Sequence, residues 1–351
     1  MQLLLAAAGA FIIVEMLFSS SFLAIVGAGE QPSLSPRRLC LFNTATGSPI
    51  RELNFLTSIL AVRVNKKRLA VILQEKTYIY DTGTLEILET IDTVPNLKGL
   101  CAFSHDLDGC FLALPASNSK GSVLVYNVTE LQTHCEIDAH RSPLAAIALS
   151  SSGKYIATAS EQGTIIRVHL VSDATKSYSF RRGSYQSTIF SLSFGPSTEL
   201  PDILLATSSS GSVHTFFLGL ALNQRIRKSN FLGAMIPNSL SDALDPTHHH
   251  ILHHAVPAGV KSFAYISHLI SSHQFVKYDL LFNSNAVVRK TDRVTDTSTS
   301  ETMALRSTIS IITSSGYFVD YSCCVNRKNE CTWMLERELN LLSPISEQTS
   351  R

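Results

Sequence analysis

The stretch from residue 144 to 182, LAAIALSSSGKYIATASEQGTIIRVHLVSDATKSYSFRR, decides the fold. It contains short apolar runs separated by turn residues such as Ser, Gly, Asp and Lys. Runs of this kind between turn residues predict β-strands, and the chain has no sustained stripe of helical period that would predict helices instead. The stretch therefore predicts a unit of four strands: Leu144–Leu149, Tyr155–Ala159, Ile165–Val168 and Ser177–Arg182.

The same order of strands recurs along the chain. The third strand of each unit carries an aromatic or β-branched marker residue, and successive markers up to Phe216 are 38, 46, 42 and 48 residues apart. Repeats of about 40 to 50 residues with several strands each are typical of propeller blades. The sequence therefore predicts an all-β, WD40-like β-propeller in which about six blades are recognisable. Their markers are Phe42, Tyr80, Tyr126, Val168, Phe216 and Tyr321.

Composition narrows the class of protein. The chain has 351 residues and a formal net charge of +1, with 45% hydrophobic and 16% charged residues. These values predict a large folded core and exclude a disordered chain or a broadly basic nucleic-acid binder. Affinity for an anion must then come from a local pocket. The seven cysteines form no Cys-x-x-Cys motif, so we interpret them as small buried hydrophobic residues in a reducing compartment.

The pair Arg181 and Arg182 ends the fourth strand of the opening stretch. Adjacent side chains on a strand point to opposite faces, so the two guanidiniums are expected to serve two different pockets. Each guanidinium presents a planar fork of donors that suits a phosphate group. The pattern predicts two anion sites that share one basic hinge. A solvated strand edge or a structural ion pair is the alternative interpretation of an Arg-Arg pair.

Three segments resemble the PROPPIN family, of the autophagy-related protein 18 or WIPI type. They are Phe180–Gly183, Ala157–Arg167 and Ala139–Ile147, and the resemblance extends from about residue 14 to about residue 342. It implies a seven-bladed propeller without enzymatic activity. It also implies binding to phosphatidylinositol 3-phosphate and phosphatidylinositol 3,5-bisphosphate, recruitment of autophagy proteins, and a role in autophagosome formation. The protein would then be cytoplasmic and peripheral on preautophagosomal, vacuolar or endosomal membranes.

The resemblance also implies the residues of two lipid pockets. In the family, Ser often stands at position 158 and Thr at position 212, and both exchanges keep a hydroxyl donor. The first pocket maps to His140, Thr158, Ser160, Gly163, Thr164, Arg167 and Arg181. The second maps to Arg182, Gly183, Ser208, Ser212 and His214.

Two segments depart from the family pattern. Residues 1–13 stand where the family has a further blade, so the propeller domain is expected over residues 14–342 with a tail at 343–351. Residues 263–285 are expected to be an insert between two family segments. The apolar N-terminus also suits a signal or anchor, but it has no basic start and is interrupted by Glu15. The competing interpretation is two strands, Val14–Phe18 and Phe22–Val26.

The loop over residues 220–260 corresponds to the family's membrane-inserting excursion. An interfacial helix there would present an apolar edge to the membrane; its alternative is a solvated loop. The histidines at 248–254 lack the spaced Cys or carboxylate partners of a metal site, so no metal is expected, and their protonation near a membrane is a milder hypothesis. The apolar residues of the proposed edge are Ile236, Leu240, Leu244, Ile251, Leu252 and Val256.

A propeller scaffold that binds only proteins is the alternative function, with Leu60–Leu88 as the surface to probe. An enzyme is not expected, because Asp106 and Asp108 lie in a turn and His140 has no evident nucleophile. No Gly-x-Ser-x-Gly motif and no phosphate-cradling loop occur. Neither a cofactor nor a nucleic-acid partner is expected.

Overall fold

The computed structural model is built from β-strands throughout the part of the chain that it describes. Six four-stranded sheets account for these strands, and none of the described residues form a helix long and apolar enough to cross a membrane. The chain divides into two compact units, residues 1–189 and 190–351. The described residues are 10–17, 20–31, 34–104, 110–195, 203–218, 249–271, 303–326 and 330–343.

The first unit contains four sheets, each formed by four strands that are consecutive in the chain and antiparallel to their neighbours. The first two sheets are formed by β1 (Phe11–Met16), β2 (Phe22–Gly27), β3 (Arg38–Asn43), β4 (Ser48–Asn54), β5 (Ala61–Val64), β6 (Arg68–Ile72), β7 (Lys76–Asp81) and β8 (Ile87–Asp92). The next two are formed by β9 (Ala102–Phe103), β10 (Phe111–Pro115), β11 (Gly121–Asn127), β12 (Gln132–His140), β13 (Leu144–Leu149), β14 (Tyr155–Ser160), β15 (Ile165–Leu170) and β16 (Asp173–Arg181).

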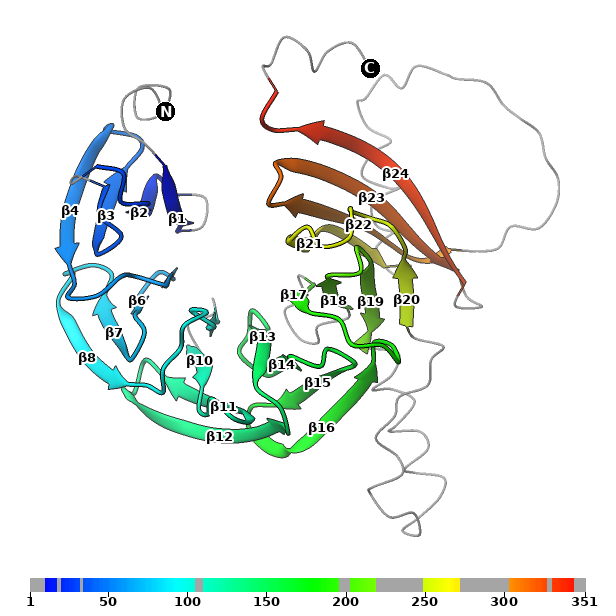
Figure 1. The fold of residues 1–351 in the computed structure, drawn as a ribbon, viewed down its shortest axis with the longest axis horizontal. Coiled ribbons are helices and arrows are strands. Elements are labelled where there is room, and N and C mark those ends of the chain that lie inside the picture. The colour runs from blue at the N-terminus through cyan, green and yellow to red at the C-terminus, as the bar shows by residue number, and fades with distance from the viewer. Residues whose placement is uncertain are drawn as a thin grey trace, which may run out of the picture. The chain divides into compact units, whose positions relative to one another are not determined.

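Within the first unit the sheets follow one another along an arc, with β4, β8, β12 and β16 on its outer side (Figure 1). Apolar side chains fill the space between neighbouring sheets. Leu39, Leu69 and Tyr80 belong to the cluster between the first two sheets, and Leu112 and Tyr126 belong to the next. The outer strands bury little, because nearly all residues of β4 and more than half of those of β12 are exposed. Sheet-against-sheet packing therefore provides the core of this unit.

The second unit contains two sheets, whose first strand begins at the boundary. The core between them includes Phe217, Ile309, Ile311 and Cys323. The strands are β17 (Ile189–Phe194), β18 (Ile203–Ser208), β19 (Val213–Phe217), β20 (His249–Leu252), β21 (Ser262–Ser271), β22 (Met303–Thr313), β23 (Tyr317–Asn326) and β24 (Cys331–Asn340).

The predicted marker residues all lie in the third strands of their sheets. Phe42, Tyr80 and Tyr126 occupy β3, β7 and β11, and the other three occupy β15, β19 and β23. The all-β prediction with six recognisable blades is therefore confirmed. The N-terminal pair of strands also forms, although β1 begins at Phe11, before the expected boundary at residue 14.

Two expected segments differ in the structure. Ile251 and Leu252 were expected on an interfacial helix, but they lie in β20 and pair with β19. Val256 is buried and belongs to the core of the second unit, so it is unavailable to a membrane. The expected helix is thus wrong for these three residues, and its other residues lie outside the described chain. The first part of the expected insert, residues 263–271, belongs to β21 and pairs with β22.

Candidate functional site

The fourth sheet places polar residues on one of its faces. Thr158 on β14 lies directly opposite Arg167 on β15 in the strand register, so their side chains share a face. Alternation along β15 brings His169 to the same face. Arg181 on β16 lies opposite Ile165. Ile165 is two residues before Arg167 on β15, so the side chains of Ile165, Arg167 and Arg181 all lie on this face. Ile156, which lies opposite His169, packs against the third sheet, so this face looks toward that sheet.

Hydrogen bonds connect these residues to the last residue of β12 on the third sheet. His140 Nε2 and Thr158 Oγ1 lie 3.0 Å apart, and Thr158 Oγ1 donates to the backbone carbonyl of Arg167 at 3.4 Å. Arg167 Nη1 donates to the carbonyl of Ala139, which precedes His140. Two sheets therefore contribute to one connected cluster. We call His140, Thr158, Arg167 and His169 the polar layer.

The two histidines of the polar layer are held neutral. Burial, and to a smaller extent the nearby Arg167 guanidinium, lower the pKa of His140 to about 4. The same two causes lower the pKa of His169 to about 4. Arg167 is therefore the positive charge of the layer at neutral pH. His169 Nδ1 is buried and has no hydrogen-bond partner among the described atoms.

Sequence reasoning did not identify His169 as part of the site. The available signal was its position two residues after Arg167 on the same strand, which places both side chains on one face. Nothing in its local sequence distinguishes it from a buried core residue. Its role emerges only when the register of β14 and β15 is known.

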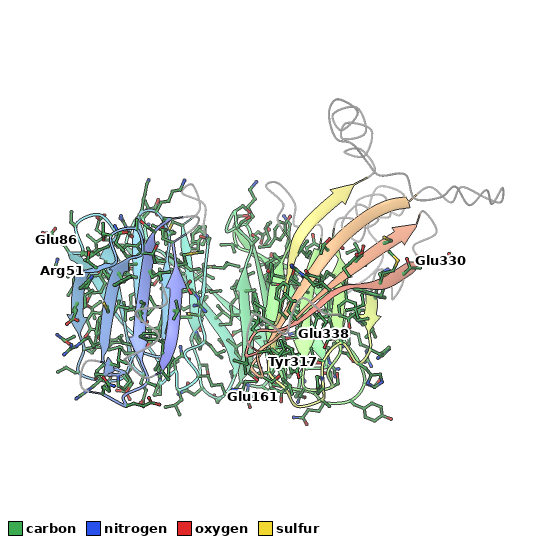
Figure 2. The ribbon with its side chains drawn as sticks, turned by 90° about the horizontal axis from the view of Figure 1, so that it is seen from above. Arg51, Glu86, Glu161, Tyr317, Glu330 and Glu338 are labelled. Atoms are coloured by element: carbon green, nitrogen blue, oxygen red, sulfur yellow. The ribbon has the colours of Figure 1, made fainter. Side chains whose placement is uncertain are left out.

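The turn between β14 and β15 brings the remaining residues of the first predicted pocket together. Ser160 is buried, and its carbonyl accepts a hydrogen bond from Gly163 N–H at 2.9 Å. Gly163 has φ of +61°, and a Cβ there would collide with the carbonyl oxygen of Ser187, so only glycine fits. The carbonyl of Thr164 accepts a hydrogen bond from Arg182 N–H at 2.8 Å. Glu161, in the same turn, is labelled in Figure 2.

Arg181 and Arg182 lie in different environments. Arg181 is the last residue of β16 and is exposed, and its side chain has no hydrogen bond or ion pair within the described part of the chain. Arg182 is only 8% exposed; its Nε donates to the carbonyl of Gly163 and its Nη2 to the carbonyl of Tyr185. Burial lowers the pKa of Arg182. The expected strand Ser177–Arg182 therefore ends one residue early, and Arg182 braces the loop that follows.

The residues of the second predicted pocket are divided between the two units. Arg182 and Gly183 belong to the first unit, and a Cβ at Gly183 would meet no atom within 4 Å. In the second unit, Ser208 ends β18 and its hydroxyl lies 2.9 Å from that of Ser210. Ser212 and His214 are buried in the same unit. This pocket stays a prediction.

Two histidines of the second unit, His214 and His249, pack against each other. His214 Nδ1 lies 2.9 Å from His249 Nε2, and the His249 ring stacks on Phe216 with centroids 4.4 Å apart. Among the described residues, no group of three or more His, Cys, Asp or Glu side chains could hold a metal ion.

Comparison with known proteins gives three findings. The model of the PROPPIN family matches residues 7–250. Autophagy-related protein 18b of Arabidopsis thaliana is 66% identical over 339 residues, which cover 96% of this chain and 87% of the relative. Autophagy-related protein 18 of Aspergillus fumigatus is 43% identical over 232 residues, which cover 60% of this chain and 51% of that relative.

A solved complex of KlAtg21 with the coiled coil of AgAtg16 has a similar fold. The TM-score is 0.62 with 23% sequence identity, over 94% of this chain and 84% of that one.

Proposed function

This chain belongs to the PROPPIN family, and on that premise we propose that it is a phosphoinositide-binding adaptor at membranes. Its ligands are the head groups of phosphatidylinositol 3-phosphate and phosphatidylinositol 3,5-bisphosphate. It acts in autophagosome formation by recruiting autophagy proteins to the preautophagosomal membrane, and vacuolar or endosomal membranes are further locations. The names of its relatives support the autophagy role.

The observation that carries the lipid proposal is the polar layer with Arg181 beside it. Arg167 supplies a half-buried positive charge, and Thr158 supplies a hydroxyl in the same layer. Arg181 is exposed and free to reach an incoming anion. A phosphomonoester carries between one and two negative charges near neutral pH, with several acceptor oxygens, so guanidinium and hydroxyl donors suit it. Ser160, Gly163 and Thr164 border this set on the turn between β14 and β15.

Arg182 has a second role in the proposal. Its guanidinium already donates to two carbonyls of the first unit, so it holds the turn at Gly163 against the loop at Tyr185. A guanidinium has five N–H donors, and those that remain can contact an anion beside the loop. The loop that Arg182 braces follows Arg181 directly, so the two arginines act together.

One observation favours a protein-binding scaffold as a second candidate. The two carbonyl contacts of Arg182 account for a basic residue in this loop without any lipid. The structurally similar KlAtg21 was solved with a coiled-coil partner, which is in line with protein binding on this fold. A scaffold would bind an autophagy protein but would not bind phosphoinositide vesicles.

Co-sedimentation with vesicles that carry different phosphoinositides tests the proposal. The native chain is expected to bind vesicles with 3-phosphorylated lipids and to ignore vesicles of phosphatidylinositol alone. The double change Arg181→Thr and Arg182→Thr is expected to abolish this binding, while circular dichroism stays as in the native chain. Vesicle binding retained by the folded double variant would contradict the assignment of the lipid site. The protein-binding scaffold would then be the remaining candidate function.

A further inference from the structure

Two cysteines of the last sheet lie next to each other in space. Cys323 on β23 and Cys331 on β24 have their sulfur atoms 3.1 Å apart. All seven cysteines are free thiols, and this is the only contact between two sulfur atoms among the described residues. We propose that Cys323 and Cys331 form an oxidisable dithiol site that closes reversibly to a disulfide across β23 and β24.

The strand register explains how the two thiols meet. Cys323 pairs with Trp333, and Cys331 pairs with Val325, so the two cysteines are diagonal neighbours on one face. A disulfide bond is about 2.05 Å long, so closure brings the two sulfur atoms about 1 Å closer together. Cys331 is the first residue of β24. Figure 2 shows the preceding Glu330 at the opposite end of the sheet from Tyr317, so the shift falls at a strand end.

The environments of the two thiols suit stepwise oxidation. Cys323 is fully buried in the core of the unit, whereas Cys331 is half-buried. The hydrogen bond from the Cys323 thiol lowers the pKa of Cys331, and the same contact, with burial, raises the pKa of Cys323. The more accessible sulfur is thus the better nucleophile, and the buried thiol is placed to resolve it.

The reaction balances with hydrogen peroxide as oxidant. The Cys331 thiolate attacks peroxide, forms a sulfenic acid and releases hydroxide, which takes up a proton to give water. The Cys323 thiol then attacks the oxidised sulfur, so that the S–S bond forms and the S–O bond breaks to release a second water. Two thiols lose two electrons and two protons in total. A dithiol reductant reverses the change by thiol–disulfide exchange.

The chain contains its own reporter and its own control. Its single tryptophan, Trp333, lies directly across from Cys323 in the ladder, so a disulfide there is expected to quench its fluorescence. Cys324 is adjacent to Cys323 but points to the other face of the sheet. A Cys324→Ser variant therefore removes a neighbouring thiol without touching the pair.

Thiol titration of the denatured protein after mild peroxide treatment tests the proposal. The count in the native chain is expected to fall from seven to five, with a mass loss of two hydrogens and a cross-link between the peptides that contain residues 323 and 331. Trp333 emission should fall and recover with dithiothreitol. The Cys324→Ser variant should still lose two thiols, and Cys331→Ser should lose none.

Several outcomes would overturn the site. These are an unchanged thiol count in the native chain, a cross-link that involves another cysteine, or a gain of oxygen mass without a cross-link. Peptide mapping of the native chain decides the matter even if Cys331→Ser fails to fold. A loss of two thiols in a folded Cys331→Ser variant would equally contradict the pairing.

Discussion

Two neighbouring interfaces between sheets of the first unit have equivalent strand ladders but different side chains at the same step. In the third sheet, Leu114 pairs with Leu124 at the fourth step of the ladder between β10 and β11. In the fourth sheet, the same step between β14 and β15 pairs Thr158 with Arg167. Leu112 and Leu114 face the second sheet in an apolar cluster, whereas Thr158 and Arg167 form the polar layer toward the third sheet.

The comparison shows which residues at this ladder step are needed for packing. A buried polar group lowers stability unless it is hydrogen-bonded, and even then an apolar residue of similar size often serves as well. The third sheet shows that this ladder step accepts two leucines. Polar residues at the same step of the fourth sheet are therefore not required by the fold. Their donors suit the anion site that we propose above.

The largest expected effect comes from making the fourth sheet resemble the third. The double change Thr158→Leu and Arg167→Leu is expected to weaken binding to phosphatidylinositol 3-phosphate vesicles on the order of a hundredfold, about 3 kcal/mol, because a charged hydrogen-bond partner is lost. The free energy of unfolding should fall by no more than about 2 kcal/mol, because His140 and the Ala139 carbonyl lose their hydrogen-bond partners. Vesicle binding and urea unfolding measure the two quantities, and undiminished binding by the folded variant would break the comparison.

The reverse change tests whether the third sheet tolerates a polar residue. Leu114→Thr is expected to lower the free energy of unfolding by about 3 kcal/mol, because it removes buried methyl groups and leaves a hydroxyl without a partner. Vesicle binding should not change once the protein is folded. A cost below about 1 kcal/mol in urea unfolding would mean that the two interfaces are less different than their residues suggest.

The turn beside the polar layer gives a smaller effect with a matched control. Gly163→Ala is expected to lower the free energy of unfolding by about 2 kcal/mol or more, because φ is positive and the new Cβ meets the Ser187 carbonyl. Gly47 also has positive φ but nothing within 4 Å of a Cβ, so Gly47→Ala should cost only about 1 kcal/mol. Equal costs in thermal or urea unfolding would show that the close packing at Gly163 is unimportant.

The smallest expected effect near neutral pH concerns the histidines. His140 and His169 have a pKa of about 4 in the folded chain, below their ordinary value of 6.5. The unfolded chain therefore binds more protons between these values, and stability falls as pH decreases from about 6.5 toward 4. Urea midpoints measured from about pH 7 to about pH 5 should fall less for His169→Gln than for the native chain. An identical slope for both proteins would show that His169 is not held neutral by folding.

Sequence alone predicts much of the fold because the strands alternate with clear turn residues. The marker strands around Phe42, Tyr80 and Tyr126 are where the repeat places them. β20 was missed because its sequence, His249–Leu252, is rich in histidine and lacks a strand pattern. Part of β21 was assigned to an insert, because the family comparison outweighed its apolar residues.

The candidate site could be predicted only in part. The family resemblance indicates Thr158, Arg167 and Arg181, and the structure brings Thr158 and Arg167 together with His140. It could not indicate that Arg182 bonds to the carbonyls of its own loop, because those contacts depend on how the turn folds back. The contact of Cys323 with Cys331 was missed for the same reason, since it depends on the register of β23 and β24.

The most direct test of the account is the affinity of Arg181→Thr for nanodiscs that carry phosphatidylinositol 3-phosphate, compared with Arg51→Thr. Both changes remove one exposed arginine and the same charge, and Arg51 lies on the outer strand β4 in Figure 2. We expect Kd to rise about tenfold for Arg181→Thr, as for one lost charged hydrogen-bond partner, and to stay near the native value for Arg51→Thr. Equal affinities for the two variants would contradict an anion site at the polar layer.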